Sequence, residues 1–271
     1  MRAARAVAAP RRRATPAGLG VPLLLATYLG LVVLLPLAAL AGQAAQLGPL
    51  GLYRAVTAPE ALAALSLTVV LSLAVALIDA VTGTAIAWEL ERDRIPGRRV
   101  LDALLDLPFA LPTIVAGLVL LALYGPGGPF GLDLAATRAG VLLALLLVTL
   151  PFVVRTVQPA VAALGRDQEE AAATLGAGPW ATFGRVVLPR LGPAVAAGAG
   201  LAFARAIGEY GAVVLISGNL PMRTELASVY IAAHVESMDL SDAAAVSLVL
   251  LALSLAVLLA LGRWERGHGV A

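Results

Sequence analysis

Residues 170–176 read Glu-Ala-Ala-Ala-Thr-Leu-Gly, and after nine further residues positions 186–189 read Val-Val-Leu-Pro. This polar run separates two long apolar stretches. The chain as a whole is 60% hydrophobic and only 13% charged, whereas soluble domains carry about 25% charged residues. The chain is therefore predicted to be an integral membrane protein, and the run from 170 to 189 is expected to form one of its water-facing loops.

This loop has the local chemistry of two short helices joined by a glycine elbow. Asp167 is expected to cap the first helix, with Glu170 at its third position, and Gly176 is expected to end that helix in the left-handed conformation. Pro179 suits the first position of the second helix, which is predicted to stop at Leu188-Pro189. The alternative interpretation is a generic pair of amphipathic helices at the membrane surface.

Six segments are long and apolar enough to cross the hydrocarbon core, which needs about 20 residues per helix. The fourth meets Arg155 soon after its apolar run, so we expect a tilted or kinked helix that continues toward Ala163. An even number of spans places both termini on one side of the membrane. The segments are Leu19 to Leu40, Ala61 to Trp88, Leu101 to Tyr124, Gly140 to Val154, Gly192 to Ile216 and Ala243 to Leu261.

Arginine is distributed unevenly, and basic residues are retained in cytoplasmic loops. The two tails and the second and fourth loops carry 15 of the 19 arginines, and the other three loops carry 3. This bias predicts that both termini and the elbow are cytoplasmic. A cleaved signal peptide is the alternative for the first segment, but its apolar run exceeds the roughly 7 to 15 residues of a signal core.

The composition excludes several kinds of site. The chain has no cysteine and two histidines, which excludes disulfides and leaves no histidine cluster, so no metal site is expected. It also has no lysine, and a P-loop needs its lysine to reach the nucleotide phosphates. We therefore expect no cofactor on this chain and no nucleic-acid partner, and the energy for any active process must come from another protein.

The run at 170–189 resembles the EAA loop of binding-protein-dependent ABC importer permeases. That pattern is EAA, three residues, Gly, nine residues, a β-branched residue, one more residue and Leu-Pro; every fixed position is matched, with Val186 where Ile is usual. In that family the loop docks into a groove on the ATPase subunit, and Glu170 is expected to bond near the elbow. The residues that the resemblance assigns to ATPase coupling are Glu169, Glu170, Ala171, Ala172, Gly176, Leu188 and Pro189.

Three further stretches, 96–113, 151–159 and 208–225, resemble the sulfate and thiosulfate permease group, in particular its T-type subunit. Molybdate and tungstate permeases are the close alternative. The resemblance covers about 61 to 261, and it leads us to expect Asn at position 79, where this chain has Asp. It implies two ATPase copies that use ATP and Mg, a second, homologous permease and a periplasmic or lipid-anchored oxyanion-binding protein.

Arg205, Glu209 and Asp79 lie inside predicted spans, where a charge is costly unless it is paired or faces water. Arg205 and Glu209 are four residues apart in a helix, so they share a face and can form a pair. Asp79 is expected either to be paired or to line water. These residues could pin helices together or contribute to the substrate path. A proton-coupled secondary transporter that uses them is the alternative from a different class.

The fifth predicted span has a small residue at every fourth position from Gly192 to Ala212, and this stripe is expected to face another helix. The stretch after it offers hydroxyl and backbone groups that suit a tetrahedral oxyanion, with Arg223 as the only positive charge. A polar turn that leads into an interfacial helix, Thr224 to Glu236, is the alternative. The candidates for the translocation path or gate are Arg205, Glu209, Tyr210, Ser217, Asn219, Arg223 and Asp79.

The expected architecture is an all-α, type I ABC importer permease with six transmembrane helices in the bacterial inner membrane. Its expected parts are a basic tail (1–18), a first helix with a periplasmic loop (19–60), a permease core of five helices (61–262) with the coupling loop at 164–190, and a second tail (263–271). The expected function is transport of an oxyanion by a heterodimer of permeases, powered by a separate ATPase.

Overall fold

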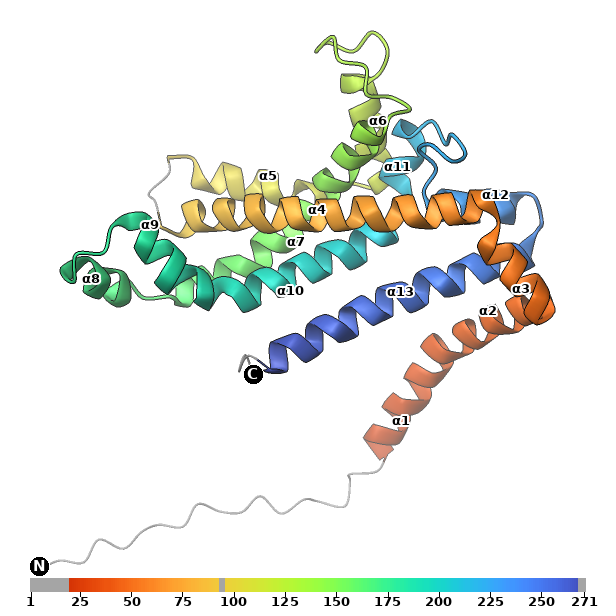
Figure 1. The fold of residues 1–271 in the computed structure, drawn as a ribbon, viewed down its shortest axis with the longest axis horizontal. Helices are drawn as coiled ribbons and strands as arrows, with labels where there is room; N and C mark the ends of the chain where they lie inside the picture. The colour runs from red at the N-terminus through yellow and green to blue at the C-terminus, as the bar shows by residue number, and fades with distance from the viewer. Residues whose placement is uncertain (1–19, 93–95, 268–271) are drawn as a thin grey trace, which may run out of the picture.

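The computed structural model describes residues 20–92 and 96–267, and every regular element within them is a helix (Figure 1). The predicted basic tail at 1–18 lies outside the described residues. Five described helical segments are long and apolar enough to cross a membrane, and a bent helix pair makes six. The prediction of an all-α membrane protein with six spanning segments is thereby confirmed.

Three long helices form the centre of the bundle. α4 (Pro59–Arg92), α7 (Arg138–Ala163) and α10 (Leu188–Ile207) pack against one another along their length, and α13 (Leu240–Gly267) packs on α10. Small buried residues allow this packing: Gly83 of α4 and Gly198 of α10 both lie directly against Val153 of α7. The predicted extension of the fourth span to Ala163 is confirmed.

The bundle has two ends, which are named here by the short helices that lie there. α8 (Asp167–Thr174) marks the α8 end, and α12 (Ala227–Glu236) marks the α12 end (Figure 1). α3 (Gly48–Thr57) packs against α13 at the α12 end.

The first spanning segment is continuous but stands apart from the centre of the bundle. It comprises α1 (Gly20–Leu29), a π-helical turn η2 (Gly30–Leu34) and α2 (Leu35–Ala45). No residue of α1 is buried, and α2 makes its main contacts with α13 and α3. Such an apolar surface is stable only in lipid or against another protein.

The third predicted span is not one straight helix. α5 (Arg98–Ala110) and α6 (Thr113–Tyr124) are separated by a break at which the chain bends by 112°. Leu111 takes an extended conformation there, because the ring of Pro112 clashes with a helical residue before it. The bend places α6 beside a segment far away in the sequence, α11 (Gly211–Ile216).

The fifth span differs from its prediction at both ends. The predicted stop at Leu188-Pro189 is wrong, because α9 (Pro179–Thr182), a π-helical turn η3 (Phe183–Val187) and α10 form one continuous helix. Proline has no N–H with which to bond the carbonyl four residues earlier. In a π turn the hydrogen bonds join residues five positions apart, so the helix continues through the proline without that bond. The helix then ends at Ile207 instead of Ile216, and α11 follows as a separate short helix.

The predicted stripe of small residues faces another helix only in part: Gly200 and Ala212 are buried, and the Ala212 carbonyl lies close to Gly117 of α6. A side chain at Gly192 or Gly208 would meet no atom within 4 Å, so both positions are open in the single chain. A neighbouring face carries Gly198, Ala202 and Ala206, which are also four residues apart and are all buried. Two small-residue stripes therefore run along α10; the second is buried at all three of these positions, and the predicted one only at some of its positions.

Candidate functional site

The elbow at the α8 end has the predicted glycine geometry. Gly176 has φ +82°, and the helix before it closes with two hydrogen bonds, from Ala177 N–H to Ala172 C=O at 3.0 Å and from Gly176 N–H to Ala173 C=O at 3.0 Å. This pair of bonds is the Schellman motif. Pro179 begins α9 as predicted. The predicted cap is wrong, because Asp167 is the first helical residue and makes no capping bond. Its negative charge instead stabilises the positive N-terminal end of the helix dipole.

Arg92 anchors the elbow to the bundle. Its guanidinium donates to the Glu169 carboxylate at 2.7 Å and to the Leu164 carbonyl at 2.7 Å, and it lies over the ring of Trp88. Glu170, which was expected to bond near the elbow, is exposed and forms no side-chain hydrogen bond within the described residues. Glu169, and not Glu170, therefore holds the loop against α4, because the helical turn of α8 points the Glu169 side chain toward α4.

The tip of the elbow exposes apolar side chains. Leu175 and Trp180 are each 88% exposed, and Ala171 is exposed as well. Beside them a groove of about 1030 Å³ runs between α4 and the elbow. Exposed apolar side chains beside a groove indicate contact with a partner. The groove is lined mainly by apolar residues, among them Val81, Trp88, Ala173, Ala177, Phe183 and Val187.

The break between α10 and α11 is held by an ion pair between a half-buried arginine and a buried glutamate. Arg205 Nη2 lies 2.6 Å from Glu209 Oε2, as the spacing predicts. Glu209 is 1% exposed, and its other oxygen accepts the Ala212 N–H at 2.8 Å. Ser228 of α12 donates to the Glu209 carbonyl. Glu209 therefore fixes the broken helix in position, whereas Arg205 and Tyr210 retain exposed surface.

The two helix breaks of the molecule lie against each other. A side chain added at Gly117 of α6 would lie 2.5 Å from the Ala212 carbonyl of α11, and one added at Gly211 would overlap Thr113 at the start of α6. Only glycine allows this approach, because the opposing atoms at Gly117 belong to backbone that cannot rotate away. The breaks that follow Ala110 and Ile207 thus form one structural unit.

Asp79 lies inside the bundle and does not line water. It is 1% exposed, and one carboxyl oxygen lies 2.6 Å from the Thr149 hydroxyl of α7. The other oxygen has no hydrogen-bond partner within the described residues. Asp79 is therefore paired through one of its two oxygens, which agrees with the first of the two expectations. Its position on α4, where it bonds to α7, favours a structural role.

The polar stretch after α11 satisfies its own hydrogen bonds. The Ser217 hydroxyl donates to Asn219 Oδ1 at 2.6 Å, and Thr224 donates to the Ser217 carbonyl at 2.6 Å. Ser217 and Asn219 are thus engaged within the turn, which favours the interpretation as a polar turn before α12. Arg223 is exposed, but the expectation that it is the only positive charge there is wrong: Arg138 donates to its carbonyl at 2.9 Å.

A charged network near the α8 end was not predicted. Arg155 of α7 bonds to Asp106 at 2.8 Å, to Asp102 at 3.1 Å and to Gln158 at 2.6 Å. It also bonds to the Asp102 backbone carbonyl. The spacing of Asp102 and Asp106, four residues apart on one helix face, was a visible signal in the sequence. Their partner is about 50 residues away, so spacing alone could not identify it.

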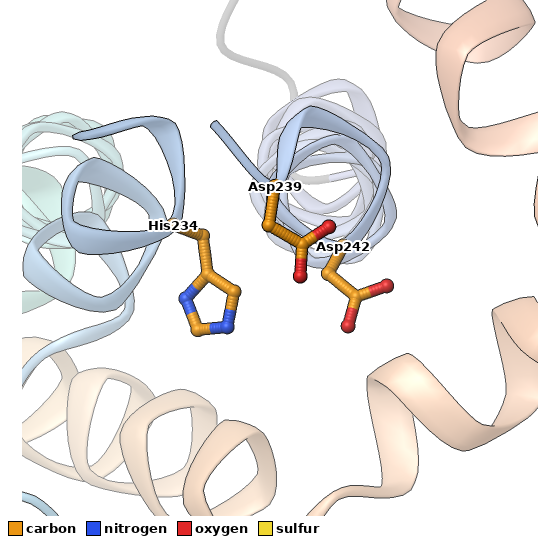
Figure 2. Close-up of side chains that lie close together, drawn as sticks. All are labelled: His234, Asp239 and Asp242. Carbon is orange, nitrogen blue, oxygen red and sulfur yellow. The ribbon is translucent and has the colours of Figure 1, made fainter. Parts of the chain in front are cut away.

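A second cluster that was not predicted lies where α12 meets α13. Figure 2 shows His234, Asp239 and Asp242 close together there, with their ligand-type atoms within 4.8 Å of one another. Glu225 is nearby, and burial raises the pKa of its carboxyl above the ordinary value, partly offset by the charge of His234. No metal site was expected at His234, because the chain has only two histidines.

Comparison with known families settles the class of protein. Residues 81–265 match the family described as "Binding-protein-dependent transport system inner membrane component". The chain belongs to this family. It is accordingly a membrane permease, that is, a transport subunit, and ATP hydrolysis in such systems resides on a separate chain.

Several curated relatives resemble this permease over most of its length. The sulfate transport system permease protein CysT of Synechocystis is 43% identical over 251 residues, covering 89% of this chain and 88% of the relative. The Escherichia coli protein of the same name is 42% identical over 258 residues, covering 93% and 92%. A probable sulfate permease of Nephroselmis olivacea is 49% identical over 212 residues, covering 76% and 75%.

Solved structures agree on the fold of this permease. A chain of a bacterial alginate ABC transporter in complex with an alginate-bound periplasmic protein has a TM-score of 0.75 at 17% identity, covering 91% of this chain and 93% of that one. A chain of the MetNI methionine ABC transporter, in an inward-facing conformation, has a TM-score of 0.55 at 16% identity, covering 76% and 96%. These likenesses confirm the predicted importer permease fold.

Proposed function

We propose that this chain is a membrane-spanning permease subunit of an ATP-driven importer of sulfate or thiosulfate. The observation that carries the proposal is the identity of 42% to 49% with proteins named as sulfate permeases, over most of both chains. Oxyanion specificity in such a system can reside in a separate binding protein, so the permease itself needs only a weak site.

The α8 end is the proposed cytoplasmic end, and the elbow is the proposed contact with the ATPase. The arginine distribution supports this orientation, with both termini cytoplasmic. The rigid Gly176 turn and the anchor between Arg92 and Glu169 allow the elbow to transmit force to α4. The ATPase copies bind ATP and Mg. Exposed Leu175 and Trp180 supply the apolar contact.

The proposed translocation path lies between this chain and a second, homologous permease. The broken fifth helix supports this assignment, because irregular backbone within a membrane is tolerated where it is buried in protein or lines an aqueous path. Gly208, Tyr210 and part of Arg205 remain exposed there. At the α12 end, the proposed periplasmic end, Arg138 and Arg223 would attract an anion delivered by the binding protein.

Transport in proteoliposomes tests the proposal. The permease is purified with its partner permease and ATPase and supplied with the binding protein, and uptake of radiolabelled sulfate is measured with and without internal ATP. We expect uptake that requires ATP, persists with a protonophore and is inhibited by excess thiosulfate.

The possible results separate the alternatives. Uptake that requires a proton gradient but not ATP would identify a secondary transporter and refute the proposed class. ATP-dependent uptake of molybdate or tungstate without uptake of sulfate would refute the substrate but leave the class intact.

A further inference from the structure

The cluster at the α12 end draws donor atoms from separate elements. His234 extends from α12, Asp239 belongs to the turn that follows, and Asp242 lies in the first turn of α13 (Figure 2). One ligand-type atom from each lies within 4.8 Å of the other two. An imidazole nitrogen and carboxylate oxygens are common ligands of zinc and similar divalent ions.

The imidazole of His234 is already oriented. Its Nδ1 lies 3.0 Å from the Tyr230 carbonyl, and its ring lies against that of Tyr230 at a tilt of 33°, with centroids 4.1 Å apart. A carbonyl oxygen only accepts hydrogen bonds, so Nδ1 carries the proton in the neutral ring and Nε2 keeps a free lone pair. A hydrogen bond of this kind, on the nitrogen that does not bind the ion, is the usual support of a metal-binding histidine.

A further carboxylate, that of Glu225, lies within electrostatic reach of this cluster. Glu225 is 8% exposed, and in the part of the chain that the structure describes it accepts no side-chain hydrogen bond and pairs with no arginine. It lies within electrostatic reach of His234 and of Glu60 at the start of α4. A carboxylate without a salt-bridge partner adds negative charge near His234, which favours a cation at the cluster.

The surrounding charge has one sign. Burial raises the pKa of the Tyr230 hydroxyl, and the negative charges of Asp242, Glu60, Glu225 and Asp239 raise it further. Among the described residues none of the four forms a salt bridge. The carboxylates of Asp239 and Asp242, with oxygens within 4.8 Å of each other, repel, and a divalent cation would neutralise both.

We propose that His234, Asp239 and Asp242 form a binding site for a divalent metal ion of the zinc type, with Glu225 as a nearby negative charge that favours the cation. Ligands about 2.0–2.1 Å from a tetrahedral ion lie about 3.3 Å apart, so the exposed Asp239 and the half-exposed Asp242 and His234 must close on binding. The bound ion would join α12 to α13. This site is independent of the proposed transport function.

Metal titration of the purified chain in detergent tests this proposal. The chain is stripped with a chelator, Zn²⁺ binding is measured by calorimetry, and Co²⁺ serves as a spectroscopic probe of coordination. We expect one saturable site per chain and a higher midpoint temperature of unfolding with Zn²⁺. His234→Ala and the double variant Asp239→Asn, Asp242→Asn are expected to weaken binding at least tenfold. Glu225→Gln is expected to weaken it as well.

Two variants control for non-specific binding. Glu236→Gln removes an exposed carboxylate from α12, two residues from His234, and His268→Ala removes the other histidine of the chain. Both are expected to bind Zn²⁺ like the unchanged protein. Circular dichroism verifies folding, and His234→Gln replaces His234→Ala if the latter does not fold. No saturable binding, or equal weakening by Glu236→Gln and His234→Ala, would overturn the proposal.

Discussion

At the scale of single residues, two glycines illustrate two different constraints. Gly176 is required for its backbone conformation, since φ is +82° and a side chain there would meet no neighbouring atom. Gly117 is required for space, since a side chain there would collide with the Ala212 carbonyl. The first constraint is local and was predicted from the residues around Gly176. The second depends on a contact between α6 and α11, so no local pattern indicates it.

The conformational role of Gly176 leads to a prediction. Gly176→Val should reduce ATP-driven uptake about tenfold or more, because a β-branched residue at positive φ costs about 1–2 kcal/mol and distorts the elbow. The measurement is uptake in proteoliposomes, with the amount of permease verified by immunoblot. Gly178→Val is the matched control: Gly178 has φ −73° and open space, so this variant should transport normally. Equal uptake by the two variants would contradict the role of the turn.

At the scale of elements, α5 depends on polar contacts to an unusual degree. None of its residues is buried, and its main contact with another helix is with α7. Arg155 bonds to both carboxylates on the inner face of α5, while Val100, Leu104 and Phe109 on the helix are exposed. Arg155 therefore supplements a limited apolar contact, in which Phe109 meets the edge of the Phe152 ring and Leu105 packs against the bundle.

We predict that Arg155→Leu releases α5. Hydrogen bonds to charged groups contribute about 1.5–3 kcal/mol each. Arg155→Leu removes several of them together at a partly exposed site. Amide exchange across 98–110 should therefore become at least tenfold faster. Hydrogen–deuterium exchange with mass spectrometry measures this. Arg99→Leu, at an exposed neighbouring position on α5, is the control and should leave the exchange unchanged. Unchanged exchange in Arg155→Leu would show that other contacts hold α5.

At the scale of the whole molecule, much of the apolar surface faces away from the chain itself. The first spanning segment contributes few buried residues, and the apolar tip of the elbow is fully accessible. A membrane covers the former type of surface, and a protein partner covers the latter. The single chain is thus one component of a larger assembly.

The exposed tip of the elbow predicts where the ATPase binds. Trp180→Ala should weaken the affinity of the purified permease for its ATPase at least tenfold, because large exposed aromatic residues at the centre of an interface carry much of the binding energy. Binding in detergent, measured with immobilised permease, tests this. Tyr53→Ala changes an exposed aromatic residue on α3, at the opposite end of the bundle, and should leave the affinity unchanged. Equal affinity of Trp180→Ala and the unchanged permease would place the ATPase contact elsewhere.

The sequence by itself determined the membrane class, the long apolar helices, the glycine elbow and the pairing of Arg205 with Glu209, because these features depend on composition and on residues within a few positions of one another. Only the tertiary structure decided the bend after Ala110, the contact of the two helix breaks, the partners of Arg155 and the approach of His234 to Asp239 and Asp242. These features depend on which distant segments pack together, and helix periodicity carries no information about that choice.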